Sequence, residues 1–207
     1  MVRKFFYLFK VKGDIPQIED IDESPLEIDG TKFQLNFKKN EMIRSLIENY
    51  FFNNQTVIGG NVTINDDNSV PFKIRSKSKL LFIETPYPRE KLRILKFFNN
   101  KFKKLNIETF IPSNKYEMEF ICKTAKLSSF KVFIDDKIVR SEETDKDICN
   151  DLKQNMEIIE ATLDIPIKNK DVTFYYYGNA IQFPNQESIE IEGVIQTFEN
   201  TMIAHAK

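Results

Sequence analysis

The chain is poor in the residues on which most enzyme active sites depend. Its 207 residues include no tryptophan, six glycines, two cysteines and a single histidine, His205, close to the C-terminus. A lone histidine in that position is a poor general base or metal ligand, which argues against histidine-based triads and zinc sites. Gly59 and Gly60 lack the spacing of a P-loop or a dinucleotide fingerprint. The sequence therefore predicts no catalytic residue, no metal site and no cofactor.

Cysteine and long apolar runs are also scarce. Cys122 and Cys149 are too few for a disulfide framework, and we expect both to be core residues rather than thiol nucleophiles. No stretch approaches the roughly 20 apolar residues that a membrane-spanning helix needs. The apolar opening, residues 1–10, is short and interrupted by lysine, so it is typical of a strand rather than a signal peptide. We expect a cytoplasmic protein with no membrane partner.

Carboxylates that bind Mg²⁺ are the one catalytic option that the composition leaves open. The available acids are Glu84, at the end of a predicted strand, and the pairs Asp66-Asp67 and Asp135-Asp136. Both aspartate pairs fall in predicted turns, where local hydrogen bonding is enough to explain them. A Mg²⁺-dependent nuclease that uses Glu84 is therefore kept as a lower-ranking alternative.

What the chain does have is a concentration of positive charge. Between Pro71 and Lys104 there are eleven lysines or arginines and two acids, a net charge of +9, whereas the whole chain carries −1. The segment from Asp14 to Gly30 is the opposite, with seven acids and no base. Such a basic stretch indicates an anionic partner, either nucleic acid or an acidic protein surface. The acidic segment is typical of a solvated loop, and it could also shield the basic region.

The pattern of apolar residues predicts an α+β fold. In the N-terminal half it predicts helices over 40–52 and 89–104, and strands over 2–12, 31–38, 55–65, 70–84 (broken near 76–78) and 105–111. From Thr31 onward the order is β-α-β-β-α-β, which is the order of the ferredoxin-like split βαβ motif. A domain boundary near Pro112 would divide the chain into 1–112 and 113–207, although one continuous domain is the alternative.

The C-terminal half is expected to be mainly antiparallel β with one or two helices. Strict alternation over 115–123 predicts a strand, and further strands are expected over 129–134, 157–167, 172–177 and 188–197. A helix capped by Ser141 or Thr144 would bury Ile148, Leu152 and Met156. Tyr175, Tyr176 and Tyr177 are ordinary strand formers that are also enriched in interfaces.

The predicted helix 89–104 separates its charges from its apolar side chains. On a helical wheel Ile94, Leu95, Phe98, Phe102 and Leu105 share one side, which we expect to face the sheet. Cations occupy the other side, the strand before the helix extends the patch, and Phe97 lies at its edge, where it could stack on a base. The candidate nucleic-acid-binding residues are Lys73, Arg75, Lys77, Arg89, Arg93, Lys96, Phe97, Lys103 and Lys104. The plain alternative is a solvated lysine-rich face.

These patterns favour a binding role over catalysis. The first hypothesis is a non-catalytic cytoplasmic binding or assembly subunit of a complex that acts on DNA or RNA. The second is a pure protein–protein interaction module or a homo-oligomer. Abundant Ile, Lys, Asn and Phe are typical of an AT-rich genome, which suggests a bacterium, its phage or a mobile element, and phage defence as the setting.

Overall fold

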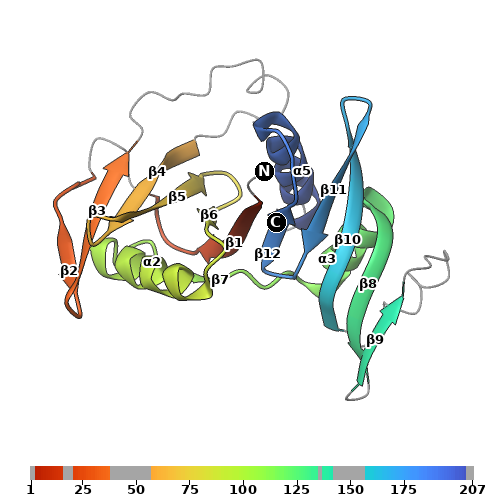
Figure 1. Ribbon diagram of the computed structural model, residues 1–207, viewed down its shortest axis with the longest axis horizontal. Coiled ribbons are helices and arrows are strands. Elements are labelled where there is room, and N and C mark those ends of the chain that lie inside the picture. The colour runs from red at the N-terminus through yellow and green to blue at the C-terminus, as the bar shows by residue number, and fades with distance from the viewer. Residues whose placement is uncertain (1–2, 16–20, 38–56, 135–136, 142–156, 204–207) are drawn as a thin grey trace. The chain divides into compact units, whose positions relative to one another are not determined.

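The chain has a mixed, sheet-rich fold with antiparallel strands (Figure 1). The computed structural model describes residues 3–15, 21–37, 57–134, 137–141 and 157–203. It divides into two compact units, Phe5–Phe110 and Ile111–Lys207 together with Met1–Lys4, here called the N-terminal and C-terminal units. The predicted helix over 40–52 and the one beginning at 141–144 lie outside the described residues. Independent folding of 1–112 and 113–207 stays a prediction.

The N-terminal unit is built on an antiparallel sheet. In sheet order its strands are β2 (Leu26–Ile28), β3 (Thr31–Phe37), β4 (Val57–Ile64), β5 (Asn68–Arg75), β6 (Leu80–Glu84), β1 (Lys4–Val11) and β7 (Ile107–Thr109). β3 pairs directly with β4, with Phe33 opposite Ile64. A split βαβ motif would place another strand between these two, so the predicted ferredoxin-like order is not confirmed. The predicted break between β5 and β6 is confirmed.

Helix α2 (Pro88–Lys101) covers one face of this sheet (Figure 1). The strands alternate between buried and exposed side chains because successive residues point to opposite faces. The buried face presents Phe33 and Phe72, whose rings contact Phe97 and Phe98 of α2 at centroid distances of 5.3 and 5.0 Å. This aromatic layer forms the core of the N-terminal unit and fixes α2 on the sheet.

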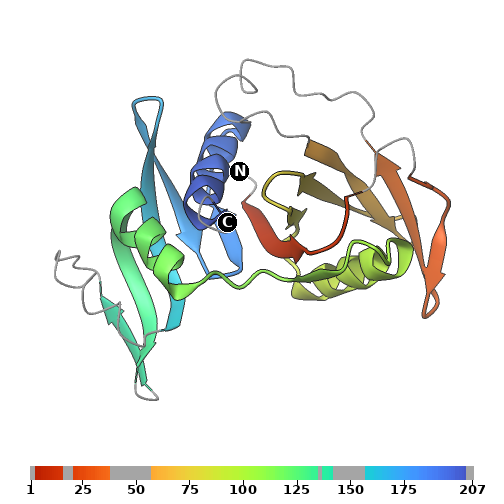
Figure 2. The same ribbon diagram turned by 180° about the vertical axis from the view of Figure 1, so that it is seen from behind.

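The C-terminal unit consists of antiparallel strands with helices packed on them. Its strands, in sheet order, are β12 (Ala180–Phe183), β11 (Lys170–Tyr176), β10 (Glu157–Ile167), β8 (Lys126–Ile134) and β9 (Lys137–Ser141). The helices are α3 (Asn114–Glu119), the π-helix η2 (Phe120–Thr124) and α5 (Ser188–Ile203), which contact one another and the sheet (Figure 2). Phe120 lies at the centre of its core, against Phe174, Tyr176 and Phe198.

Two predicted strands of the C-terminal unit are helices. The alternation over 115–123 predicts a strand, yet α3 and η2 occupy this segment and bury Met118, Phe120 and Ile121. The predicted strand over 188–197 is the first part of α5, whose buried residues Ile191, Val194, Ile195 and Phe198 follow helical spacing. In both segments the apolar residues are few enough to fit the two-residue period of a strand and the 3.6-residue period of a helix. Tertiary packing therefore decides which of the two forms.

Gly60 marks the tightest point of the N-terminal sheet. A Cβ atom at this position would lie 2.4 Å from the Asn36 carbonyl oxygen and 3.1 Å from the ring of Phe72. At the neighbouring Gly59 the nearest atom, the Phe72 carbonyl oxygen, would be 3.8 Å away, an ordinary contact. Gly60 is therefore needed for close packing of β3, β4 and the aromatic layer, whereas Gly59 is not.

We expect Gly60→Ala to lower the free energy of unfolding by about 1–3 kcal/mol, because the added methyl group overpacks a rigid backbone contact. Gly59→Ala is the matched control and should change it by less than about 0.5 kcal/mol. Urea denaturation followed by circular dichroism measures both values. Equal effects of the two substitutions would contradict the packing described for β3 and β4.

Candidate functional site

Most of the predicted site residues lie on α2. The helix begins at Pro88, whose ring suits the first helical position, and Glu90 in the first turn complements the helix dipole. The Glu90 carboxylate accepts a hydrogen bond from the Thr85 hydroxyl at 2.5 Å, which ties the start of α2 to the end of β6. The helix ends at Lys101, three residues earlier than predicted, because the chain turns through Asn106 (φ 45°) to enter β7.

The buried side of α2 is rotated relative to the predicted one. Ile94, Phe97 and Phe98 are the buried residues of the helix, whereas Leu95, which was predicted on the buried side, is only half-buried. Phe97 is 0% exposed and stacks on Phe33, so the predicted role of its ring, stacking on a base, is corrected to a role in the core. The large ring of Phe97 gains more by burial than the smaller side chain of Leu95 does, which favours this rotation.

The cations of β5 do not extend the surface of α2. Phe72 points toward the helix, so its strand neighbours Lys73 and Arg75 alternate toward the opposite face of the sheet. Arg75 is 0% exposed and interacts inside the protein, while Lys73 is half-buried. Lys77 is exposed in the turn that follows β5. Of these three candidates, Arg75 is buried and cannot contact a partner. Lys73 lies on the face of the sheet opposite to α2.

The remaining candidates form a row along the exposed side of α2. Arg89, Arg93 and Lys96 are all exposed, and their spacing of four and three residues places them on one stripe of the helix. Lys103 and Lys104 are exposed in the turn after the helix. Within the described part of the chain, the side chains of Arg89, Arg93, Lys103 and Lys104 make no ion pair or hydrogen bond. These four side chains therefore offer uncompensated positive charge.

Residues 21–30 of the acidic segment, which was predicted to be a solvated loop, pack against this helix. Strand β2 lies beside α2 (Figure 1), and the β2–β3 turn has Asp29 and Gly30 at φ 50° and 71°, the signature of a type I′ hairpin. The turn holds the Asp29 carboxylate against the ammonium group of Lys96 in an ion pair. Both side chains are more than half exposed. The middle of the cationic row is thus neutralised by the chain itself.

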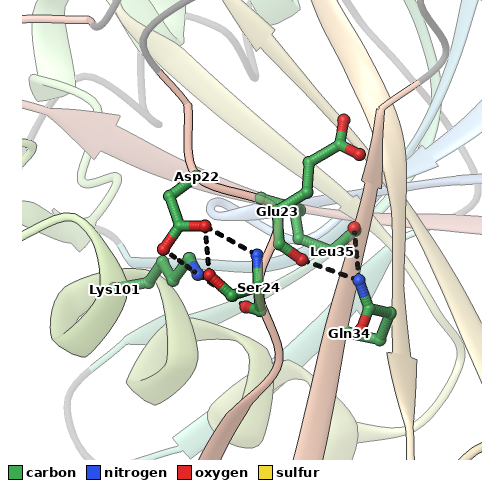
Figure 3. A network of polar contacts seen from close by, with 6 residues as sticks. All are labelled: Asp22, Glu23, Ser24, Gln34, Leu35 and Lys101. Carbon is green, nitrogen blue, oxygen red and sulfur yellow. Dashed lines mark hydrogen bonds and ion pairs between the residues drawn. The ribbon is translucent and has the colours of Figure 1, made fainter.

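A second contact lies at the C-terminal end of α2 (Figure 3). The Lys101 ammonium group donates to the Ser24 carbonyl oxygen at 2.6 Å and pairs with Asp22 Oδ2 at 3.3 Å. The Lys101 side chain is only 8% exposed, so segment 22–24 covers it. Gln34 Nε2 donates to the Glu23 carbonyl oxygen at 2.7 Å and fixes the same segment to β3.

The contacts of segment 22–24 lower the pKa of Asp22. Its carboxylate accepts hydrogen bonds from the hydroxyl and the backbone N–H of Ser24, and it also faces Lys101. These contacts, with Ser24 as the largest cause, lower the pKa of Asp22 from 3.8 to about 2. A lowered pKa in the folded state means that the contacts favour the ionised form.

The structure brings together a further group of cations. The end of β1, the β5–β6 turn and the turn after α2 meet because Val11 N donates to Lys79 O and Gly13 N to Leu105 O, both at 2.8 Å. A Cβ atom on Gly13 would lie 1.7 Å from the Lys104 carbonyl oxygen, so only glycine permits this approach. The lysines of these three segments are Lys10, Lys12, Lys77, Lys79, Lys103 and Lys104.

This lysine cluster is only partly compensated. Lys10 Nζ donates to the Ser78 carbonyl oxygen at 3.2 Å, and Lys12 pairs with Glu108 at 2.6 Å. Burial and the nearby charge of Lys79 lower the pKa of Lys10. Lys79 belongs to the basic stretch that the sequence shows, whereas Lys10 and Lys12 were not predicted to join it. No local pattern could have found them, since the contact between Lys10 and Ser78 spans 68 positions.

No catalytic arrangement emerges among the described residues. Glu84 is half-buried at the end of β6 and already interacts within the protein. Within the ranges that the structure describes, no three His, Cys, Asp or Glu side chains gather to hold a metal ion. His205, Cys149 and the pair Asp135-Asp136 lie outside those ranges.

Two other sequence features have structural explanations. Tyr176 is buried, and its hydroxyl donates to Glu117 Oε1 at 2.8 Å; burial above all raises its pKa. Tyr175 and Tyr177 are half-buried on the other face of β11. Cys122 is half-buried in η2.

Comparison with models of known protein families and with curated protein sequences finds no match. Among the described helices, none has the length and apolarity needed to cross a membrane. The function must therefore be inferred from the chemistry of the surface just described.

The pKa of Asp22 gives a direct test of how segment 22–24 is held. Because it falls from 3.8 to about 2 in the folded protein, these contacts stabilise the segment above about pH 4 and are lost as the pH falls toward 2. We expect Ser24→Ala to raise the pKa of Asp22 more than Lys101→Met does, because Ser24 is the larger cause. Carboxyl-carbon NMR titration measures it, and the reverse order would contradict the assigned geometry.

Proposed function

We propose that this protein is a non-catalytic binding or assembly subunit that holds DNA or RNA by its phosphate backbone. The surface is the exposed row of α2, continued by the turn that follows it. The observation that carries the proposal is the pair Arg89 and Arg93, one turn apart, exposed and without an ion-pair partner among the described residues. Guanidinium groups bind phosphate in two-pronged geometry, and such contacts are independent of base sequence.

The length and direction of the surface support a polyanion rather than a small anion. A helix of 14 residues extends about 20 Å, long enough to follow several phosphates. At its C-terminal end the turn with Lys103 and Lys104 is itself part of the lysine cluster, which continues through Lys79. An extended phosphate chain could therefore pass from the start of α2 to this cluster. With Phe97 buried, binding depends on charge and not on stacking.

A protein partner is the second candidate, favoured by a separate observation. Tyr87 and Leu92 are 61% and 60% exposed, close to Arg89 and Arg93. Exposed Tyr, Leu and Arg side chains in one place are typical of interface cores, either with an acidic partner or with a second copy of the chain. A nuclease that uses Glu84 ranks below both candidates.

The proposal includes a cytoplasmic location, no cofactor, and a phage-defence or mobile-element setting. These parts rest on the sequence composition alone.

We expect Arg89→Gln with Arg93→Gln to weaken binding to a labelled 30-nucleotide DNA or RNA at least tenfold at low salt. If each arginine contacts one phosphate, the slope of log affinity against log salt should become shallower by about 1.4 for single strands and 1.8 for duplexes. Fluorescence anisotropy at several salt concentrations measures both quantities.

The matched control is Lys32→Gln with Lys126→Gln, which removes the same charge at exposed positions outside α2. An equal loss in the control would mean that only net charge matters and would refute a specific surface. If the wild type binds no nucleic acid but sedimentation shows salt-sensitive self-association that Arg89→Gln abolishes, the protein-partner candidate replaces the first.

A further inference from the structure

The tip of the β2–β3 hairpin occupies the centre of the cationic row. Asp29 pairs with Lys96, which lies between Arg93 and the turn that carries Lys103. A phosphate chain that follows the row would need the Lys96 ammonium group as a partner. It would meet the negatively charged Asp29 carboxylate there instead. The Lys96–Asp29 pair is exposed, with side-chain exposures of 53% and 76%, so water can replace either partner at little cost.

The two contacts that residues 21–30 make with α2 differ. Lys101 is nearly buried under segment 22–24 and donates to the neutral Ser24 carbonyl oxygen as well as to the Asp22 carboxylate, so two acceptors hold it. Among the described residues, the side chain of Lys96 contacts the exposed Asp29 carboxylate alone. The contact at Lys101 therefore anchors the segment on α2, whereas the hairpin tip can leave Lys96 without unfolding β2.

We propose that Asp29 is a built-in competitor that mimics the phosphate partner and must be displaced from Lys96 before a nucleic acid can bind along the whole row. This inference rests on the proposed function. Asp29 thereby lowers the affinity for weakly held anions, because each must replace an existing ion pair. A partner that also engages Arg89 and Arg93 has other contacts to offset that cost.

Displacement of Asp29 from Lys96 should change how the affinity for nucleic acid depends on salt concentration. In the wild type, Lys96 exchanges one anionic partner for another, and the released Asp29 takes up a cation. Binding at Lys96 should then release almost no net counterion. Without the Asp29 charge, the same contact should release one counterion and steepen the salt slope by about 0.7 to 0.9.

The chain offers a well-matched pair of variants. Asp29→Asn removes the charge and keeps the hairpin, because asparagine favours the positive φ of a type I′ turn. The control is Asp66→Asn in the β4–β5 turn, where Asp66 also has positive φ and is also paired, at 2.9 Å, but with Lys32 of β3. Both substitutions change the net charge equally, so any difference reports the contact with α2.

We expect Asp29→Asn to tighten binding of the labelled 30-nucleotide DNA or RNA by about two- to fivefold beyond the effect of Asp66→Asn, the range for one exposed ion pair. In a Lys96→Met background this additional tightening by Asp29→Asn should disappear, because Asp29 then has no ammonium group with which to pair. The steeper salt slope should likewise appear only when Lys96 is present.

The possible failures can be told apart. Equal effects of the two aspartate substitutions in a wild type that binds nucleic acid would overturn the competitor role and leave the proposed function intact. An excess that persists with Lys96→Met would show long-range electrostatics instead and would overturn it as well. If neither the wild type nor Asp29→Asn binds nucleic acid at low salt, the proposed function fails and the competitor role fails with it.

Discussion

The contact between the aromatic layer of the sheet and α2 determines the properties of the N-terminal surface. Phe97 and Phe98 pack on Phe33 and Phe72, and this packing fixes the rotation of the helix about its axis. The rotation in turn decides which cations point outward and which lysine, Lys101, lies beneath the acidic segment. The electrostatics of the surface are therefore a consequence of how four phenylalanine rings fit together.

The sequence predicted the elements of the N-terminal half better than their arrangement. Strong alternation and clear turn residues predicted β3, β4 and the break between β5 and β6. The three-residue β2 was missed because its acidic surroundings resemble a loop. Sheet order could not be read from the pattern, since the direct pairing of β3 with β4 depends on contacts far apart in sequence. In the C-terminal half, short apolar runs fitted both periods, and two helices were predicted as strands.

For the candidate site, too, the sequence predicted local features better than long-range contacts. Amphipathic spacing correctly predicted that Arg89, Arg93 and Lys96 share an exposed side of one helix. It could not fix the rotation to better than about one residue position, so Phe97 was placed at the edge instead of in the core. Arg75 was grouped with the helix because it is close in sequence, although strand alternation turns it to the other face. The pairing of Asp22 and Asp29 with α2 and the lysine cluster are long-range contacts without a local signal.

The first strand of the chain is among the last to find its neighbours. β1, which carries the run Phe5-Phe6-Tyr7-Leu8-Phe9, pairs with β6 at Phe6–Glu84 and with β7 at Phe9–Thr109. During synthesis this apolar segment leaves the ribosome long before either partner exists. An unpaired strand of this composition is prone to intermolecular association. The N-terminal unit therefore depends on rapid pairing of β1 with β6 and β7, or on a chaperone, during synthesis.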